Sequence, residues 1–179
     1  IGADLTRTAG SGILEGQQFF AGAKNHERVS YSYGMYDNAG DPTQRSDYIY
    51  IGRGLSRVET YDIAGLPLDS KDALVSESFY EGAKGEERML NNITYGTGSV
   101  KTEETNYTYG MNGIGVYFIS HMTNKNYSST GEVIGRTETT NDIHFANTRG
   151  ALIEDKNGNI RNQNIKSYYS GNGVEKLET

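Results

Sequence analysis

The sequence predicts an all-β protein whose antiparallel strands repeat with a period of about 60 residues. Three observations support this: short segments of alternating apolar and polar residues, frequent Gly and Asn between them, and one ten-residue pattern that occurs twice. Gly occurs 23 times in the 179 residues, Tyr 14 times and Pro only 2 times. Alternation with a period of two indicates a strand with one buried face, and Gly, Asn and Asp favour tight turns.

The repeated pattern occupies residues 19–28 and, 60 residues later (79 − 19), residues 79–88. Each copy has an aromatic pair, a Gly-Ala-Lys turn and a Glu-Arg exit. A second pattern, at residues 48–60, returns at residues 168–179, with a middle copy at residues 106–113. A fixed internal period of this kind indicates a duplicated structural unit.

The repeats keep their phase from one end of the chain to the other. Thr179 aligns with Thr60, so the next residue in register would align with Tyr61. Ile1 is the counterpart of Tyr61, because each lies 18 residues before its copy of the aromatic pair. We therefore expect about three whole repeats, cut from a longer array or stacked head to tail between subunits; the alternative is a duplicated domain with accidental ends.

In chain order, the first expected strand has Ile1, Ala3 and Leu5 on one face, and a Gly-Ser-Gly break follows it. Such a strand packs on its own domain or completes the sheet of a neighbour. Further strands are expected at residues 13–20, 28–33, 45–51, 55–63, 74–80, 88–95, 100–109 and 115–122. The run 115–120 is the most apolar, which predicts a strand buried on both faces.

Short connections between these segments predict antiparallel sheets, arranged either as an immunoglobulin-like sandwich or as a β-meander. Residues 64–73, with Gly65 and Pro67, form the one candidate linker. We therefore predict a first β unit at residues 1–65. Residues 66–179 are expected to hold a second and a third β unit, or one continuous domain.

Composition argues against several classes of function. The net charge of −6 argues against nucleic-acid binding, which requires a basic surface. Cys is absent, so disulfides, thiolate metal sites and a Cys nucleophile are excluded. No apolar run approaches the ~18 residues of a membrane span. His26, His121 and His144 have no metal-ligand spacing, and we expect no catalytic residues, cofactor or metal; a β-fold hydrolase is the least supported alternative.

Two Tyr-Asp-x-x-Gly pentads, at residues 36–40 and 61–65, and a partial third at residues 155–160 resemble the YD or Rhs repeats of large bacterial surface and toxin-encapsulating proteins. In that family the tyrosine ends a strand, Asp-x-x-Gly turns the chain, and tandem copies build long antiparallel sheets. The resemblance implies an extracellular or bacterial cell-surface location. The family's repeats are near ~20 residues long, so this chain departs from the family in its period.

Two functions from different classes are expected. In the first, the chain is a structural subunit of an extracellular bacterial filament, a linear or helical polymer in which Ile1, Ala3 and Leu5 enter the sheet of another copy by β-strand addition. In the second, it is an adhesive or carbohydrate-binding β-sandwich module of a giant repetitive surface protein, and its tyrosines stack on sugars.

Asn-x-Ser/Thr triplets are candidate glycosylation sites, or products of an Asn-, Ser- and Thr-rich composition. They begin at Asn92, Asn106 and Asn126.

Overall fold

The computed structural model describes residues 16–111, 115, 117–142, 144–146, 152–154, 162–171 and 174–178. Contacts divide the chain into two units, Ile1–Val100 and Lys101–Thr179. The described part of each unit is built from antiparallel strands. Among these residues there is no helix with the length and apolar character that crossing a bilayer requires.

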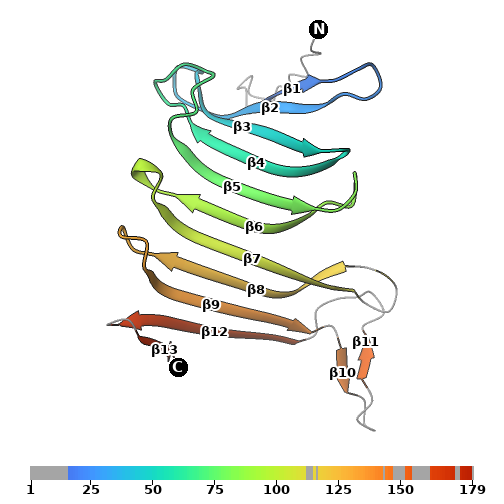
Figure 1. Cartoon of the computed structure of the whole chain (residues 1–179), viewed down its shortest axis with the longest axis vertical. Helices are drawn as coiled ribbons and strands as arrows, with labels where there is room; N and C mark the ends of the chain where they lie inside the picture. The colour runs from blue at the N-terminus through green and yellow to red at the C-terminus, as the bar shows by residue number, and fades with distance from the viewer. Residues whose placement is uncertain are drawn as a thin grey trace. The chain divides into compact units, whose positions relative to one another are not determined.

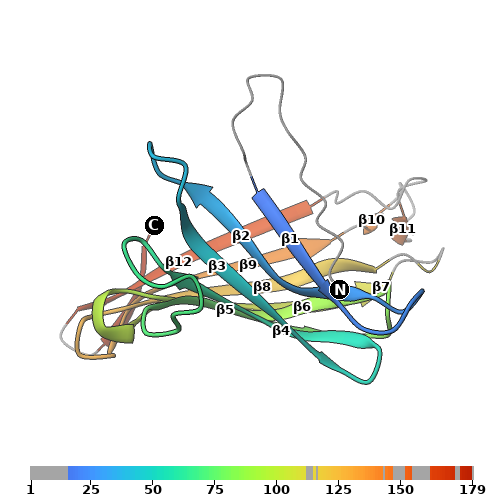
Figure 2. The same ribbon diagram turned by 90° about the horizontal axis from the view of Figure 1, so that it is seen from above.

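The first unit is a meander in which each strand pairs with the next (Figure 1). Its strands are β1 (Gly16–Ala21), β2 (Arg28–Tyr36), β3 (Pro42–Ile51), β4 (Gly54–Asp62), β5 (Leu74–Glu81) and β6 (Arg88–Tyr95). A 3-10 turn, η1 (Thr97–Ser99), follows β6. Figure 2 shows that the strands turn relative to one another from β1 to β6, as the right-handed twist of L-residue strands requires.

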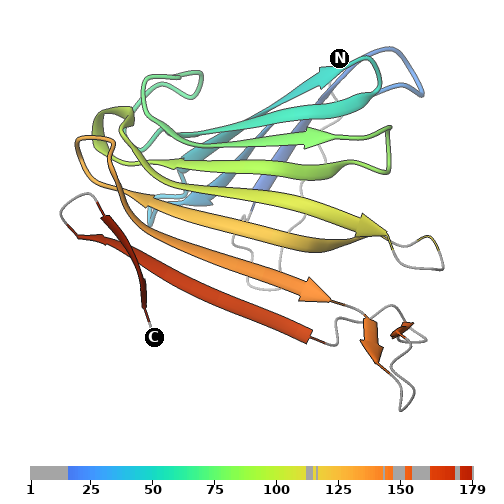
Figure 3. The same cartoon turned by 60° about the horizontal axis from the view of Figure 1, so that its bottom comes forward.

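The second unit has the strand order β7-β8-β9-β12-β13. These strands are β7 (Lys101–Met111), β8 (Tyr117–Tyr127), β9 (Val133–Asp142), β12 (Asn162–Gly171) and β13 (Val174–Glu178). Between β9 and β12 the chain forms a separate small hairpin of β10 (His144–Ala146) and β11 (Leu152–Glu154). Figure 3 shows this hairpin beyond the ends of β9 and β12.

The predicted all-β, antiparallel class is confirmed, and of its two alternatives the described strands form the β-meander. The predicted unit boundary after Gly65 falls inside the first unit. The strands on either side of it, β4 and β5, pair in register, for example Val58 with Ser78. The segment 63–73 therefore connects two strands of one sheet, and the division of residues 66–179 into a second and a third β unit stays a prediction.

The 60-residue period corresponds to four consecutive strands, that is, two hairpins. β1 and β5 carry the two copies of the aromatic pair, and β2 and β6 begin at the arginine of each copy. In both hairpins the pairing register shifts within the aromatic pair, between Phe19 and Phe20 and between Phe79 and Tyr80. A β-bulge at this place re-aims the side chains that follow it, so the two copies share their local geometry as well as their sequence.

The interior of the first unit lies beneath the β4–β5 loop. The described side chains include two buried hydrophobic ones, Ile63 at 1% exposure and Tyr61 at 6%. The loop is tied to the sheet around them: Lys71 Nζ lies 2.5 Å from Asp47 Oδ2, and a loop carbonyl accepts a hydrogen bond from the Arg45 guanidinium at 3.1 Å. This core is as thin as the 35% hydrophobic composition predicts.

The strand predicted to be buried on both faces is not buried. Tyr117, at the start of β8, is 48% exposed, and Phe118 and Ile119 are half-buried. That prediction was wrong because burial on both faces needs a layer on each side of the sheet, and the described strands of this unit supply no second layer over β8.

Both Tyr-Asp-x-x-Gly pentads turn the chain at the end of a strand. Asp37 Oδ1 accepts the backbone N–H groups of two turn residues, each at 2.9 Å. Asp62 Oδ1 likewise accepts that of Ala64 at 2.9 Å. The pentad glycines, at positions 40 and 65, have φ of 87° and 69°, a conformation that costs a residue with a side chain more than it costs glycine. In this chain the pattern therefore forms a turn through contacts within the pentad and the residue after it.

Candidate functional site: a tyrosine groove

Three hairpin turns of the first unit, at residues 22–27, 52–53 and 82–87, stand at the same end of the sheet, at the right in Figure 1. They are linked by hydrogen bonds between neighbouring hairpins. Arg28 Nη1 donates to the Gly52 carbonyl at 2.8 Å, and the Leu55 N–H donates to Glu87 Oε1 at 3.3 Å. The three turns therefore form one edge on which a site is held.

The two copies of the repeated pattern form the outer two turns, and each requires its glycine. Gly22 and Gly82 have φ of 127° and 116°. A Cβ at Gly22 would lie 2.8 Å from the His26 carbonyl oxygen, and a Cβ at Gly82 would lie 2.5 Å from that of Glu86. Each turn closes with an N–H donated to the carbonyl of the turn alanine, at 2.8 and 2.9 Å.

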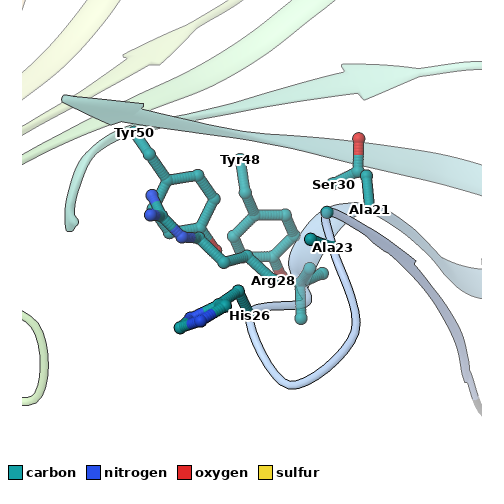
Figure 4. A pocket seen from close by; sticks show the side chains of 9 residues that line it. Ala21, Ala23, His26, Arg28, Ser30, Tyr48 and Tyr50 are labelled. Atoms are coloured by element: carbon teal, nitrogen blue, oxygen red, sulfur yellow. The ribbon is translucent and has the colours of Figure 1, made fainter. Parts of the chain in front are cut away.

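Two open hollows, of about 420 and 580 Å³, lie beside these turns on one face of the sheet. Both are lined by Arg28, Val29, Tyr48 and Tyr50, so the two hollows adjoin at these residues. Figure 4 shows the smaller of the two. We call the two hollows together the tyrosine groove; its aromatic lining is Phe20, Tyr48, Tyr50 and Tyr80.

The repeat explains how these four rings converge. Tyr48 and Tyr50 are two residues apart on β3, so both project from the same face. Phe20 and Tyr80 are the second aromatic residues of the two pattern copies, and they approach from β1 and β5 on either side. Each hairpin of the edge therefore contributes to a single groove.

Arg28 lies against the ring of Tyr50, with its guanidinium carbon 5.1 Å from the ring centroid (Figure 4). Burial raises the pKa of Tyr50 above its ordinary value of 10.0, and the charge of Arg28 opposes that rise. At neutral pH the Tyr50 hydroxyl is thus protonated and available as a hydrogen-bond donor in the groove.

Glu87 is held by backbone N–H groups. Hydrogen bonds from its own N–H and from those of Leu55 and Gly85 lower the pKa of Glu87, against a smaller opposing effect of burial. The Gly85 N–H donates to Oε2 at 2.6 Å, and Leu55 donates to the other carboxylate oxygen. Glu87 therefore anchors the third turn to β4 as an ionised group.

Of the residues predicted from sequence, the three asparagines do not line the tyrosine groove. Ile1, Ala3 and Leu5 are outside the described residues. Asn92 lies in β6, where its amide nitrogen donates to Ser78 Oγ at 2.9 Å. Asn106 lies in β7, and Asn126 is exposed in β8.

The alternating tyrosines of residues 45–51 predict a strand face but do not by themselves predict a site. Alternation alone does not show whether a neighbouring element covers that face. The described residues also contain no group of three or more His, Asp or Glu side chains placed to hold a metal ion.

No protein-family model matches the chain, and no curated protein matches it. A solved structure, that of a protein with unknown function from Bacteroides fragilis, is 12% identical, and the alignment covers 87% of this chain and 89% of that chain with a TM-score of 0.22. At that TM-score the likeness carries no argument about this chain's fold or function.

Proposed function

We propose that this chain is a carbohydrate-binding module of an extracellular or cell-surface protein and that it holds a sugar chain in the tyrosine groove. The observation that supports the proposal is the convergence of Phe20, Tyr48, Tyr50 and Tyr80 on one open depression. Ligand sites are concave, mostly apolar and aromatic, with a few polar groups that fix orientation. A tyrosine offers both a flat apolar ring and a hydroxyl at its edge, which match the C–H face and the hydroxyls of a sugar.

The other face of the same sheet shows what structural aromatic residues look like here. Phe19 stacks on Tyr31 with ring centroids 4.4 Å apart, and Tyr33 packs edge-on against Phe19 at 5.5 Å. The Arg45 guanidinium covers Tyr31 from the next strand, at 4.7 Å. These rings pack against one another, as cross-strand pairs that stabilise a sheet, whereas the tyrosines of β3 border an open volume.

The extent of the groove favours a chain over a single sugar. Its two hollows share the β3 tyrosines but continue toward different turns, one toward Ala23 and His26 and the other toward Lys84 and Glu87. A ligand that contacts both hollows has to cross the tyrosines between them. An oligosaccharide of several units fits this arrangement better than a monosaccharide.

The test is a binding screen of the whole chain against soluble neutral and acidic polysaccharides, followed by titration calorimetry with the Tyr48→Ala variant. We expect binding that Tyr48→Ala weakens at least about tenfold, or roughly 1.4 kcal/mol. Tyr33→Ala is the matched control: it removes a tyrosine from the opposite face, so it lowers stability while the folded protein keeps its affinity. No binding in the screen, or equal affinity of the Tyr48→Ala variant, would contradict the proposal.

A second proposed function is that of a filament subunit assembled by β-strand addition. It is favoured by the position of β1, which comes first in the strand order of the sheet. The outermost strand of a sheet is a template for pairing with another chain, and Ile1, Ala3 and Leu5 are the proposed donor residues. Electron microscopy and light scattering of the whole chain test this. Fibres that persist after residues 1–15 are deleted would contradict strand donation, and a whole chain that stays monomeric would contradict assembly.

A further inference from the structure

We infer that the tyrosine groove selects anionic sugar chains, and that Arg53 and Lys84 supply the cations that recognise the carboxylate or sulfate groups. This inference rests on the proposed function and names the substrate class of the same groove. Two observations support it. The first is the set of charged residues that line the larger hollow, and the second is that some of these residues already bind other groups of the protein while others do not.

The local charge of the groove is opposite in sign to that of the chain. The larger hollow is lined by three cations, Arg28, Arg53 and Lys84, and by two carboxylates, Glu27 and Glu87, which leaves an excess of one positive charge (3 − 2). The whole chain carries a net charge of −6. A basic depression on an acidic protein concentrates anionic ligands there.

Two of these five charges are engaged by the protein. Arg28 lies on Tyr50 and donates to the Gly52 carbonyl. Both carboxylate oxygens of Glu87 accept backbone N–H groups. Neither group can therefore bind a ligand without losing contacts that hold the turns together.

Arg53 and Lys84 differ from Arg28 and Glu87 in their contacts. Both are exposed at the tips of neighbouring turns, the β3–β4 turn and the β5–β6 turn. The charge of Lys84 also lowers the pKa of Glu87, but by less than the backbone hydrogen bonds do. Among the described residues, however, neither cation makes a hydrogen bond or an ion pair with another side chain.

The two cations suit an acidic sugar chain in complementary ways. A guanidinium binds a carboxylate or sulfate through two parallel hydrogen bonds, while an ammonium acts as a point charge. Arg53 and Lys84 line the same hollow as the tyrosines of β3. They therefore place two charges beside the rings on which the sugar would stack.

The chain contains a matched control for this assignment. Lys24 is the counterpart of Lys84 in the first copy of the repeated pattern, and it is likewise exposed in a hairpin turn. Lys24 does not line either hollow of the groove. Removing Lys24 therefore changes the net charge of the chain as much as removing Lys84 does, without changing the groove.

The experiment compares binding of de-esterified pectin with binding of the same polymer after methyl esterification, which differs in carboxylate charge. We expect the whole chain to prefer the charged form by about tenfold, with affinity that falls as salt rises. The double variant Arg53→Ala/Lys84→Ala should reduce this preference to within about twofold, while Lys24→Ala should leave it unchanged. Chondroitin with and without sulfation then distinguishes a carboxylate from a sulfate as the recognised group.

Three results would overturn the inference. These are equal affinity for the charged and esterified polymers, a preference that survives in the double variant, and a loss in the Lys24→Ala variant as large as in the double variant. Equal, Tyr48-dependent affinity for both polymers would overturn this inference alone and leave carbohydrate binding standing. Absence of binding to any polysaccharide would overturn the proposed function as well.

Discussion

The two copies of the repeated turn pattern have the same backbone but use their arginines differently. In the second copy Arg88 pairs across the strands with Glu81, and the two side chains form an ion pair at 3.6 Å. In the first copy the residue across from Arg28 is Ala21. Without a carboxylate opposite it, Arg28 reaches the neighbouring hairpin, where it contacts Tyr50 and a turn carbonyl.

The glutamates before these arginines differ as well. Glu87 of the second copy accepts backbone N–H groups from its own turn and from Leu55 of the neighbouring strand, whereas Glu27 is exposed at the rim of the groove. The residues that both copies share therefore fix the conformation of the turn. The residues that differ determine which neighbouring groups the arginine and the glutamate of each copy contact. Four substitutions or changes of condition test this difference.

The largest effect is expected from the turn glycines. Gly82→Ala places a Cβ 2.5 Å from a backbone oxygen at a φ of 116°, so we expect a loss of roughly 2–3 kcal/mol in the free energy of unfolding. Gly22→Ala, with its contact at 2.8 Å, should cost about as much or less. Gly40→Ala is the control, because it has a φ of 87° and no atom within 4 Å. Urea denaturation measures all three; an equal cost for Gly82→Ala and Gly40→Ala would contradict the clash.

Ala21→Glu converts the first copy into the second at one position. We expect the new carboxylate to draw Arg28 away from Tyr50. Since the charge of Arg28 lowers the pKa of Tyr50, that pKa should rise further. Ala21 lines the smaller hollow, so the added negative charge should also lower affinity for an anionic sugar chain, by about threefold to tenfold. Titration of ¹³C-labelled tyrosine followed by NMR measures the pKa. An unchanged Tyr50 pKa would show that Ala21 does not control the position of Arg28.

A smaller effect is expected on acidification. The pKa of Glu87 is lowered from its ordinary value of 4.5, so its contribution is fully present above that pH and is lost as the pH falls through the folded-state pKa. Hydrogen-exchange protection of the Leu55 and Gly85 amides should therefore decrease below about pH 4.5. Glu87→Gln should remove this pH dependence, and Glu27→Gln should retain it. Acid-independent protection in the unaltered chain would contradict the anchoring role of Glu87.

The smallest effect is expected from Glu81→Ala. Glu81 is 51% exposed in its ion pair with Arg88, and surface pairs of this kind contribute about 0–1 kcal/mol. We expect a change in the free energy of unfolding of at most about 0.5 kcal/mol and no change in sugar binding. A loss above about 1 kcal/mol in urea denaturation would show that the cross-strand pair is more than a solvated surface contact.

The strands and turns follow from the sequence because their causes are local. The alternation over residues 28–33 predicts a strand that begins where β2 begins, since a period of two needs no distant partner. The pentad turns are equally local, because Asp37 and Asp62 accept backbone N–H groups two residues ahead. The hairpin turns of the 60-residue repeat are local in the same sense, because each turn needs its own glycine.

The groove, in contrast, depends on the tertiary structure. Tyr31 and Tyr33 have the same spacing on β2 as Tyr48 and Tyr50 on β3, so no local pattern separates the two pairs. The first pair packs against Phe19 on the face that the β4–β5 loop covers, while the second pair lies on the open face of the sheet. Alternation assigns side chains to faces, but only a loop that returns from later in the chain determines which of those faces is covered and which remains open to a ligand.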